Sequence, residues 1–268
     1  MDYGQTLPLL DELGRDLLHV SVWQKGFALT LPFALVVAYA LLWATGYWWA
    51  ALMCPVLISV FTYGSVSHDL VHRNLKLPRW LNEMLLTSIE MLTLRSGHAY
   101  RASHLNHHAH FPDASDIEGA AAGMPLPRAI LDGVTLQFRI WICAIRRNSP
   151  HRRLIILEGC AALVIGILCF ASAWWTLGPA VYCVMVLCGA WIFPIVTVVI
   201  PHRADGVDEL HQTRLFRGKM FSWLALEHLY HLEHHLYPQV PHQNWPKLAR
   251  RLDPVFRSRG IAPLKLLF

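Results

Sequence analysis

Residues 26–67 read GFALTLPFALVVAYALLWATGYWWAALMCPVLISVFTYGSVS and contain no Asp, Glu, Lys or Arg. A second long apolar run, residues 154–201, contains Glu158 as its one charged residue. A membrane-spanning helix needs about 20 predominantly apolar residues, so each run can hold two spans joined by a tight turn. The sequence therefore predicts an all-α integral membrane protein with four transmembrane helices, at about 26–44, 47–67, 154–175 and 177–200.

The alternative for these runs is a set of buried core helices in a soluble protein. Core helices of a globular domain keep a polar face with a period near 3.6 residues, and neither run shows such a stripe. Only 15% of the residues are charged, whereas a soluble protein of this kind carries about 25%. Both observations oppose the soluble alternative.

The basic residues predict how the chain is oriented. All 23 Lys and Arg lie outside the two apolar runs, in residues 1–25, 68–153 and 202–268. With two spans in each run these three segments share one side of the membrane, which the positive-inside rule makes cytoplasmic. We therefore expect both termini and the active site to be cytoplasmic. Nucleic-acid binding is not expected, because the sequence contains no basic segment with interleaved aromatic residues.

The remaining segments predict one domain, residues 1–268, whose cytoplasmic cap comprises residues 68–153 and 201–268. Trp80–Leu94 is too short to span and reads as re-entrant or interfacial. Ala129–Ile145 is amphipathic and flanked by arginines, so it is expected to lie along the membrane surface. Ala114–Pro127 reads as a loop.

The N-terminal 25 residues do not resemble a cleavable signal peptide, because four acidic residues and no basic region precede the apolar run. Their leucines, from Leu10 to Leu18, predict a helix that either lies in the membrane interface or packs on the protein. The six cysteines form no CxxC pair, so neither a disulfide framework nor a thiolate metal site is indicated.

Histidines carry the chemical signal. Four groups follow or flank the spans on the predicted cytoplasmic side, with spacings of three or four residues that place imidazoles on neighbouring positions of a helix. Their nine members are the candidate metal ligands: His68, His72, His104, His107, His108, His202, His231, His234 and His235.

Nine imidazoles exceed what one ion needs, so the pattern predicts two metal ions with four or five protein ligands each. Imidazole alone leaves iron, zinc, copper and nickel open. The HExxH motif of zinc proteases is absent, because Asp69 stands where its glutamate would be. The Glu-x-x-His pairs of soluble di-iron bundles are absent as well. No catalytic residue beyond the metal ligands is predicted.

Carboxylates beside the clusters are candidates to accept the second ring N–H of a ligand histidine, which fixes its tautomer. They are Asp69, Asp113, Asp116, Glu227 and Glu233. For Asp113 and Asp116 a purely loop-building role is the alternative. The other histidines are expected to be solvated or hydrogen-bonded, and among them His228 is the one to test first as a ligand because it lies one turn before His231.

The clusters resemble the three histidine boxes of the membrane fatty acid desaturase and hydroxylase superfamily. The boxes match His68–His72, His104–His108 and His231–His235, and His202 falls where that family has a further ligand after its last span. The resemblance covers roughly His68 to Pro241. It implies two iron ions, dioxygen as co-substrate, a lipid substrate from the bilayer, and electrons from a separate ferredoxin or cytochrome carrier.

Finer details resemble the carotenoid-ring hydroxylases and ketolases. These details are Arg73-Asn74 after the first box, His110, Asp113 and Asp116 after the second, Pro201-His202-Arg203, and the stretch Tyr230–Pro238. Acyl-lipid desaturases share much of this pattern. The resemblance thus implies removal of hydrogen from an unactivated C–H bond, which ends in an alcohol, a ketone or a double bond.

Three functions are therefore hypotheses. The favoured one is a carotenoid or related isoprenoid hydroxylase or ketolase, and the next is a fatty-acyl desaturase or hydroxylase. The third, of another class, is a non-catalytic metal-binding or metal-transport membrane protein. A transporter should place ionisable residues at mid-depth in the bilayer, and the nearly charge-free spans oppose it.

Overall fold

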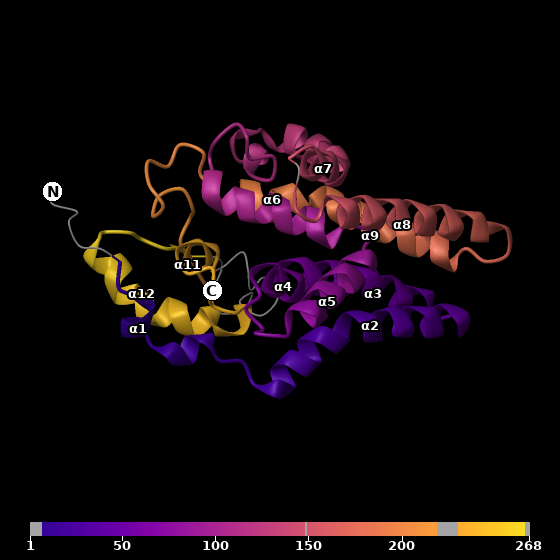
Figure 1. Cartoon of the computed structure of the whole chain (residues 1–268), viewed down its shortest axis with the longest axis horizontal. Helices are drawn as coiled ribbons and strands as arrows, with labels where there is room; N and C mark the ends of the chain where they lie inside the picture. The colour runs from indigo at the N-terminus through magenta and orange to yellow at the C-terminus, as the bar shows by residue number, and fades with distance from the viewer. Residues whose placement is uncertain (1–6, 148, 219–229, 266–268) are drawn as a thin grey trace.

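The computed structural model describes residues 7–147, 149–218 and 230–265 of the chain. Two helical hairpins extend side by side toward one end of the molecule, and the histidine-bearing helices lie at the base of both (Figure 1). Helices α11 (His231–Leu236) and α12 (Trp245–Ser258) lie at the opposite end from the hairpin tips. The fold is all-α, as the sequence predicts. The described residues also contain a two-residue parallel pairing of β1 (Phe216–Arg217) with β2 (Leu264–Lys265) and an isolated bridge between His202 and Thr213.

The first hairpin consists of α2 (Val22–Ala44) and α3 (Trp48–Phe61). Ser21 caps α2, since its hydroxyl accepts from the N–H of Gln24 while the Gln24 side chain accepts from the N–H of Ser21. The turn between the helices uses Gly46 at φ 82°, a left-handed conformation that glycine adopts without a steric penalty.

The second hairpin consists of α8 (Arg152–Ala171), a 3₁₀ turn η4 (Ser172–Trp174) and α9 (Gly178–Pro194). Tyr39 of the first hairpin donates its hydroxyl to the carbonyl of Gly178 at 2.6 Å, which joins the two hairpins near their tips.

Both hairpins lead into π turns shortly before a candidate ligand. The first, η2 (Thr62–Ser67), runs directly into α4 (His68–His72), and the second, η5 (Ile195–Val199), precedes His202. A π turn widens the helix and rotates the residues on its C-terminal side, and such turns are frequent at functional sites.

Among the described residues, four helical stretches are long and apolar enough to cross a membrane: Arg15–Ala44, Trp48–His72, Arg152–Trp174 and Gly178–Val199. Many of their large apolar side chains face outward. Exposed tryptophans mark the hairpin tips, at Trp49, Trp174 and Trp175, and the start of α2, at Trp23. Belts of this kind form at membrane interfaces. The protein is therefore an integral membrane protein, and the prediction of four spans is confirmed.

The segment between the hairpins is helical. It contains α5 (Arg79–Met91), α6 (Gly97–His110) and α7 (Leu126–Arg146). Helix α7 buries Gly133, Leu136 and Ile140 but exposes Leu131 and Phe138, as expected for a helix lying along a membrane surface. The predicted loop before α7 contains a short 3₁₀ turn, η3 (Gly119–Gly123).

The N-terminal leucines pack on the protein. They form α1 (Leu10–Leu13) and a 3₁₀ turn η1 (Arg15–Leu18), in which Leu13 and Leu17 are buried against α12 side chains such as Leu252. Of the two alternatives for this segment, burial supports the packed one. A last 3₁₀ turn, η6 (His242–Asn244), leads into α12.

Close packing of α7 on α9 depends on Gly133. A Cβ atom at this position would overlap the carbonyl oxygen of Trp191 and lie 3.2 Å from Cδ of Pro194. Because a backbone carbonyl cannot yield as a flexible side chain can, Gly133→Ala should cost about 1–3 kcal/mol. Thermal unfolding of detergent-solubilised protein measures this loss. Gly26→Ala is the control, because no heavy atom beyond its own neighbours lies within 4 Å of a Cβ there, and an equal melting temperature for both variants would contradict the prediction.

Candidate metal centre

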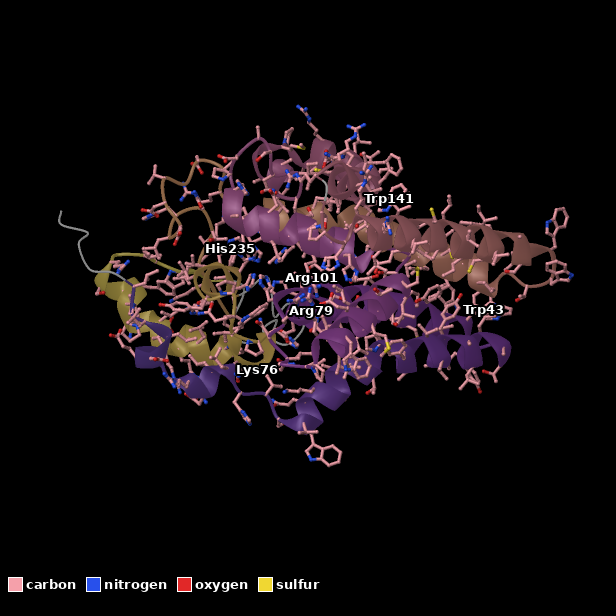
Figure 2. All side chains as sticks on the ribbon, in the orientation of Figure 1. Trp43, Lys76, Arg79, Arg101, Trp141 and His235 are labelled. Atoms are coloured by element: carbon pink, nitrogen blue, oxygen red, sulfur yellow. The ribbon has the colours of Figure 1, made fainter. Side chains whose placement is uncertain are left out.

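All nine candidate ligands meet at the base of the hairpins, in two groups. The first group contains His68, His72, His104, His108 and His234, and the second contains His107, His202, His231 and His235. Within each group one ring nitrogen per residue lies within 4.8 Å of the others. Figure 2 shows side-chain nitrogen atoms, in blue, gathered between the labelled His235 and Arg101.

In the first group the side chain of His234 lies at the centre. Its Nε2 atom is 2.9 Å from Nε2 of His68 and 2.8 Å from Nε2 of His108. Nε2 of His108 is also 3.1 Å from Nε2 of His104. Segments more than 100 residues apart therefore converge on one point.

In the second group His202 has the central place. Its Nε2 atom is 2.9 Å from Nε2 of His107 and 3.2 Å from Nε2 of both His231 and His235. Helices α6 and α11 each supply both groups, because residues three and four apart lie on adjacent parts of the same helical face.

These contacts fit a metal better than they fit hydrogen bonding among the rings. A neutral imidazole nitrogen offers either one proton or one lone pair, so Nε2 of His202 cannot satisfy three neighbouring Nε2 atoms. Within the part of the chain that the structure describes, Nε2 of His72 is buried without a hydrogen-bond partner. A cation placed among lone pairs would satisfy all of these nitrogens, and imidazole is the commonest side-chain ligand for one.

The rings are held in the metal-binding form. Burial lowers the pKa well below its ordinary value for four members that lie outside the spans, and neighbouring imidazoles lower it further: His108, His202, His234 and His235. These rings are therefore neutral, with a lone pair available at neutral pH.

Two carboxylates hold one histidine of each group. Asp116 lies 2.7 Å from Nδ1 of His107, and Glu118 lies 2.8 Å from Nδ1 of His104. Burial alone would lower the pKa of His107, but the hydrogen bond with Asp116 and the charges of both carboxylates raise it. Each carboxylate accepts the Nδ1 proton and so leaves Nε2 free to bind a metal.

Loss of such a carboxylate typically costs 10–100-fold in metal affinity. We therefore expect Glu118→Gln and Asp116→Asn each to lower metal affinity about 10–100-fold, measured by competition with a chelator. Asp113→Asn is the matched control, because Asp113 lies in the same loop but is exposed. Affinities equal to the wild type in the first two variants would show that these contacts do not tune the ligands.

Other candidate carboxylates have different partners. Asp69 bonds to His242 through Nδ1 at 2.7 Å, because its place one residue after His68 turns it about 100° away from the ligand face of α4. Glu233 pairs with Arg217 at 2.6 Å, although burial raises its pKa to about 7. Asp113 is exposed, and Glu227 lies outside the described residues.

Among the described residues, the remaining histidines do not join the two groups. His98 lies between two carboxylates, with Nδ1 2.8 Å from Glu158 and Nε2 2.8 Å from Glu83. His110 contacts the carbonyl of Asn106, and His211 contacts Asp208. His228, the first of these to test as a ligand, lies outside the described residues.

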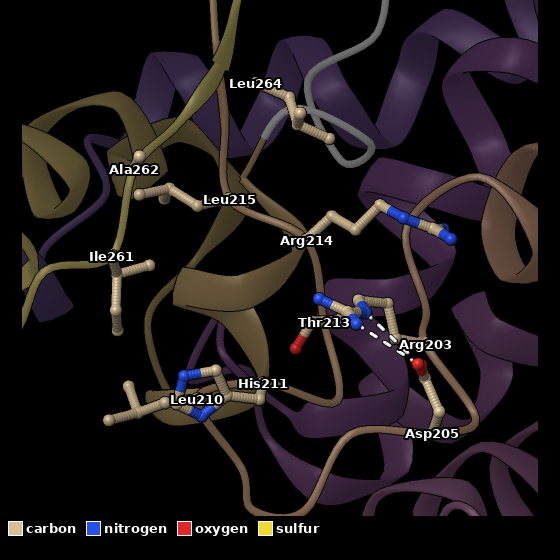
Figure 3. A pocket seen from close by; sticks show the side chains of 10 residues that line it. All are labelled: Arg203, Asp205, Leu210, His211, Thr213, Arg214, Leu215, Ile261, Ala262 and Leu264. Carbon is tan, nitrogen blue, oxygen red and sulfur yellow. Dashed lines mark hydrogen bonds and ion pairs between the residues drawn. The ribbon is translucent and has the colours of Figure 1, made fainter.

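The backbone around His202 is held by the loop on its C-terminal side. Arg214 donates to the carbonyls of Val199, Ile200 and His202, the last two at 2.6 Å. Figure 3 shows this loop around a surface pocket, with the Arg203–Asp205 ion pair on one side. The residues that line this pocket include Arg203, next to His202, but none of the nine candidate ligands.

Glu118 and Asn74 are functional-site residues whose roles the sequence alone does not predict. Asn74 donates to the carbonyl of Pro238 at 2.9 Å and so joins the end of the first histidine box to the chain after the third. Glu118 lies two residues beyond Asp116, a spacing that could have suggested a second carboxylate from the same loop.

Comparison with known proteins agrees with this geometry. No curated protein matches the chain. A family model described as "Fatty acid desaturase" matches residues 46–264, which include all four histidine groups and three of the four spans. The chain therefore belongs to the fatty acid desaturase family of membrane oxidoreductases.

Proposed function

We propose that the nine histidines hold two iron ions and that the protein uses dioxygen and external electrons to oxidise a long apolar lipid, with a carotenoid or related isoprenoid as the favoured substrate. The observation that carries the proposal is the division of nine buried or half-buried imidazoles into a group of five and a group of four. When bound, the two irons supply the reductive activation of dioxygen that is needed to attack an unactivated C–H bond.

The chain's own residues keep this centre dry and ordered. The ring of Phe111 lies 4.6 Å from that of His202 and 5.3 Å from that of His107, measured between centroids. Tyr100 and Trp245 are fully buried beside the first group. These aromatic walls exclude water from the ligands, which protects a reactive oxidant from side reactions.

The position of the centre suits a substrate that arrives through the bilayer. Both histidine-bearing ends of the hairpins continue directly from spans whose outer surfaces are apolar. A lipid can therefore approach along the helices without crossing water. The distribution of basic residues supports a cytoplasmic location of the centre and of both termini, where a soluble electron carrier of the ferredoxin or cytochrome type could reach it.

The preference for a carotenoid rests on the sequence motifs around the histidine boxes. A fatty-acyl substrate is the second candidate, because the matching family model is described as "Fatty acid desaturase". Expression in one host that makes cyclic carotenes and in another that is rich in unsaturated fatty acids separates them. We expect new oxygenated carotenoids in the first host, detected by liquid chromatography with mass spectrometry, and none with the His234→Ala variant. New fatty-acid double bonds or hydroxyl groups without new carotenoids would favour the second candidate.

A non-catalytic metal-binding role is the candidate of another class. Glu158, the one charged residue of the second apolar run, is buried and already accepts from Ser96, Thr87 and His98, so it offers no open site to a transported ion. Substrate-dependent oxygen consumption by the purified protein with a chemical reductant would exclude this role. Metal binding without any oxygen consumption, in the presence of carotene and of fatty-acyl lipid, would support it.

A further inference from the structure

The chain after the third histidine box is attached to the first box at several points. Asp69 is fully buried, and both of its oxygens accept from His242: from the backbone N–H at 3.2 Å and from Nδ1 at 2.7 Å. Five residues along, Asn74 donates to the carbonyls of Pro238 at 2.9 Å and of Val240 at 3.4 Å. Residues 238–245 and α4 are thus fixed to each other along the length of α4.

Trp245 extends this connection to the ligands themselves. Its indole is buried, with the ring centroid 5.4 Å from that of His68 and 5.2 Å from that of His234. Its Nε1 atom donates to the carbonyl of Val240 at 2.9 Å, which fixes the plane of the ring. The indole therefore packs against two ligands of the first group that come from different histidine boxes.

This arrangement answers a geometric need of the first group. His68 and His234 are separated by 166 residues in sequence, yet their Nε2 atoms lie 2.9 Å apart. Side chains with free χ angles would have to lose that freedom when they bind a metal, and the cost of ordering them weakens binding. A rigid ring packed on both imidazoles removes much of that cost before the metal arrives.

In the part of the chain that the structure describes, Trp245 has ring contacts with two members of the first group and with His242, but with no member of the second group. Among the described residues, the aromatic side chain beside His107 and His202 is Phe111, which belongs to the loop after α6. The two groups therefore have separate supports. A change in residues 242–245 should weaken the first group selectively.

We propose that the Asp69–His242 pair and Trp245 form a clamp that positions His68 and His234, so that the iron of the first group is held more tightly than five unsupported imidazoles would hold it. These are positioning residues, since none of them is a ligand. The inference rests on the proposed binding of two irons.

The test uses purified full-length protein loaded with iron and a chelator titration that follows iron release. In His242→Phe an aromatic ring is kept but the Nδ1 donor to Asp69 is lost, and in Trp245→Leu the indole is lost. We expect each variant to release half of its iron at a chelator concentration about 10–100-fold lower than the wild type, while the other half is released as before. His242→Asn restores a donor near the Nδ1 position and should recover most of the wild-type curve.

His98→Phe is the matched control, because it also removes a buried histidine that is bonded to carboxylates but does not contact either group. This variant should have a lower thermal stability, but its two irons should not be released at chelator concentrations further apart than in the wild type. The clamp is refuted if His242→Phe and Trp245→Leu give the wild-type release curve. It is also refuted if both irons of these variants are released at the same lowered chelator concentration, as a general loss of stability would produce. A wild-type protein that binds no iron would instead refute the proposed function, whatever the variants do.

Discussion

Replacement of His234 by alanine is expected to abolish turnover and to empty the first metal group, while the protein remains in the membrane. The imidazole of His234 is central, since its Nε2 atom lies within 3 Å of Nε2 of both His68 and His108. Its removal takes away one of five ligands and leaves a cavity where the metal should be held. The spans do not depend on this side chain, because the hairpins pack through apolar contacts elsewhere.

Two measurements check this prediction: product formation in a host that supplies substrate, and iron content of the purified variant. His110→Ala is the control, because His110 is exposed on the same helix as the second box and its ring bonds to the carbonyl of Asn106 rather than to a ligand. We expect the control to keep its iron and its activity. Normal turnover by the His234→Ala protein would show that this histidine is not a ligand of the metal centre.

Replacement of Glu158 by leucine is expected to destabilise the whole fold rather than the centre alone. The carboxylate is buried among four donors: the hydroxyls of Thr87 and Ser96, and the backbone N–H and Nδ1 of His98. Ser96 also caps α6, the helix that carries His104, His107 and His108, through the N–H of Ala99. Leucine would leave these donors buried and unpaired.

Breaking a buried pair of this kind costs about 3–5 kcal/mol, so the melting temperature of the solubilised protein should fall by at least about 6 °C. The matched control is Glu209→Leu, since Glu209 is exposed in the loop after His202. An unchanged melting temperature for Glu158→Leu would show that this network does not anchor α6. Glu158→Gln should recover part of the loss, because its amide oxygen can still accept.

The spans and the histidine groups could be predicted from sequence because both are local patterns. The span length is set by the thickness of the bilayer, and the run of residues 26–67 has no charge to interrupt it. The spacing within His104–His108 already places its histidines on neighbouring positions of one helix. That the boxes would meet is expected from their positions at the same ends of the spans.

The residues that hold the ligands in place could not be predicted in the same way, because their contacts depend on how loops and distant segments of the chain pack against the histidine-bearing helices. Asp69 is adjacent to His68, yet the helix turns it toward His242, 173 residues away. Asp116 and Glu118 reach the second box only because the loop after α6 reverses direction. The sequence makes Asp113 and Asp116 equal candidates, and only the fold shows that Asp113 is exposed.

The π turns before His68 and His202 were also beyond a sequence prediction, since their residues read as ordinary continuations of the spans. Their effect is to change the register of the helix, so that the first ligand after each span faces the interior. The N-terminal leucines illustrate a different limit. Their spacing fits a membrane surface and a protein surface equally, and only the packing of Leu17 on the C-terminal core decides between them.

Iron analysis of the purified protein, expressed with iron and zinc both available, tests the central claim most directly. Two groups of converging imidazoles should retain about two irons per chain, one for each group of four or five ligands. The His234→Ala and His202→Ala variants, one from each group, should each retain less. A wild-type protein that purifies with no iron, or with zinc in its place, would contradict the account.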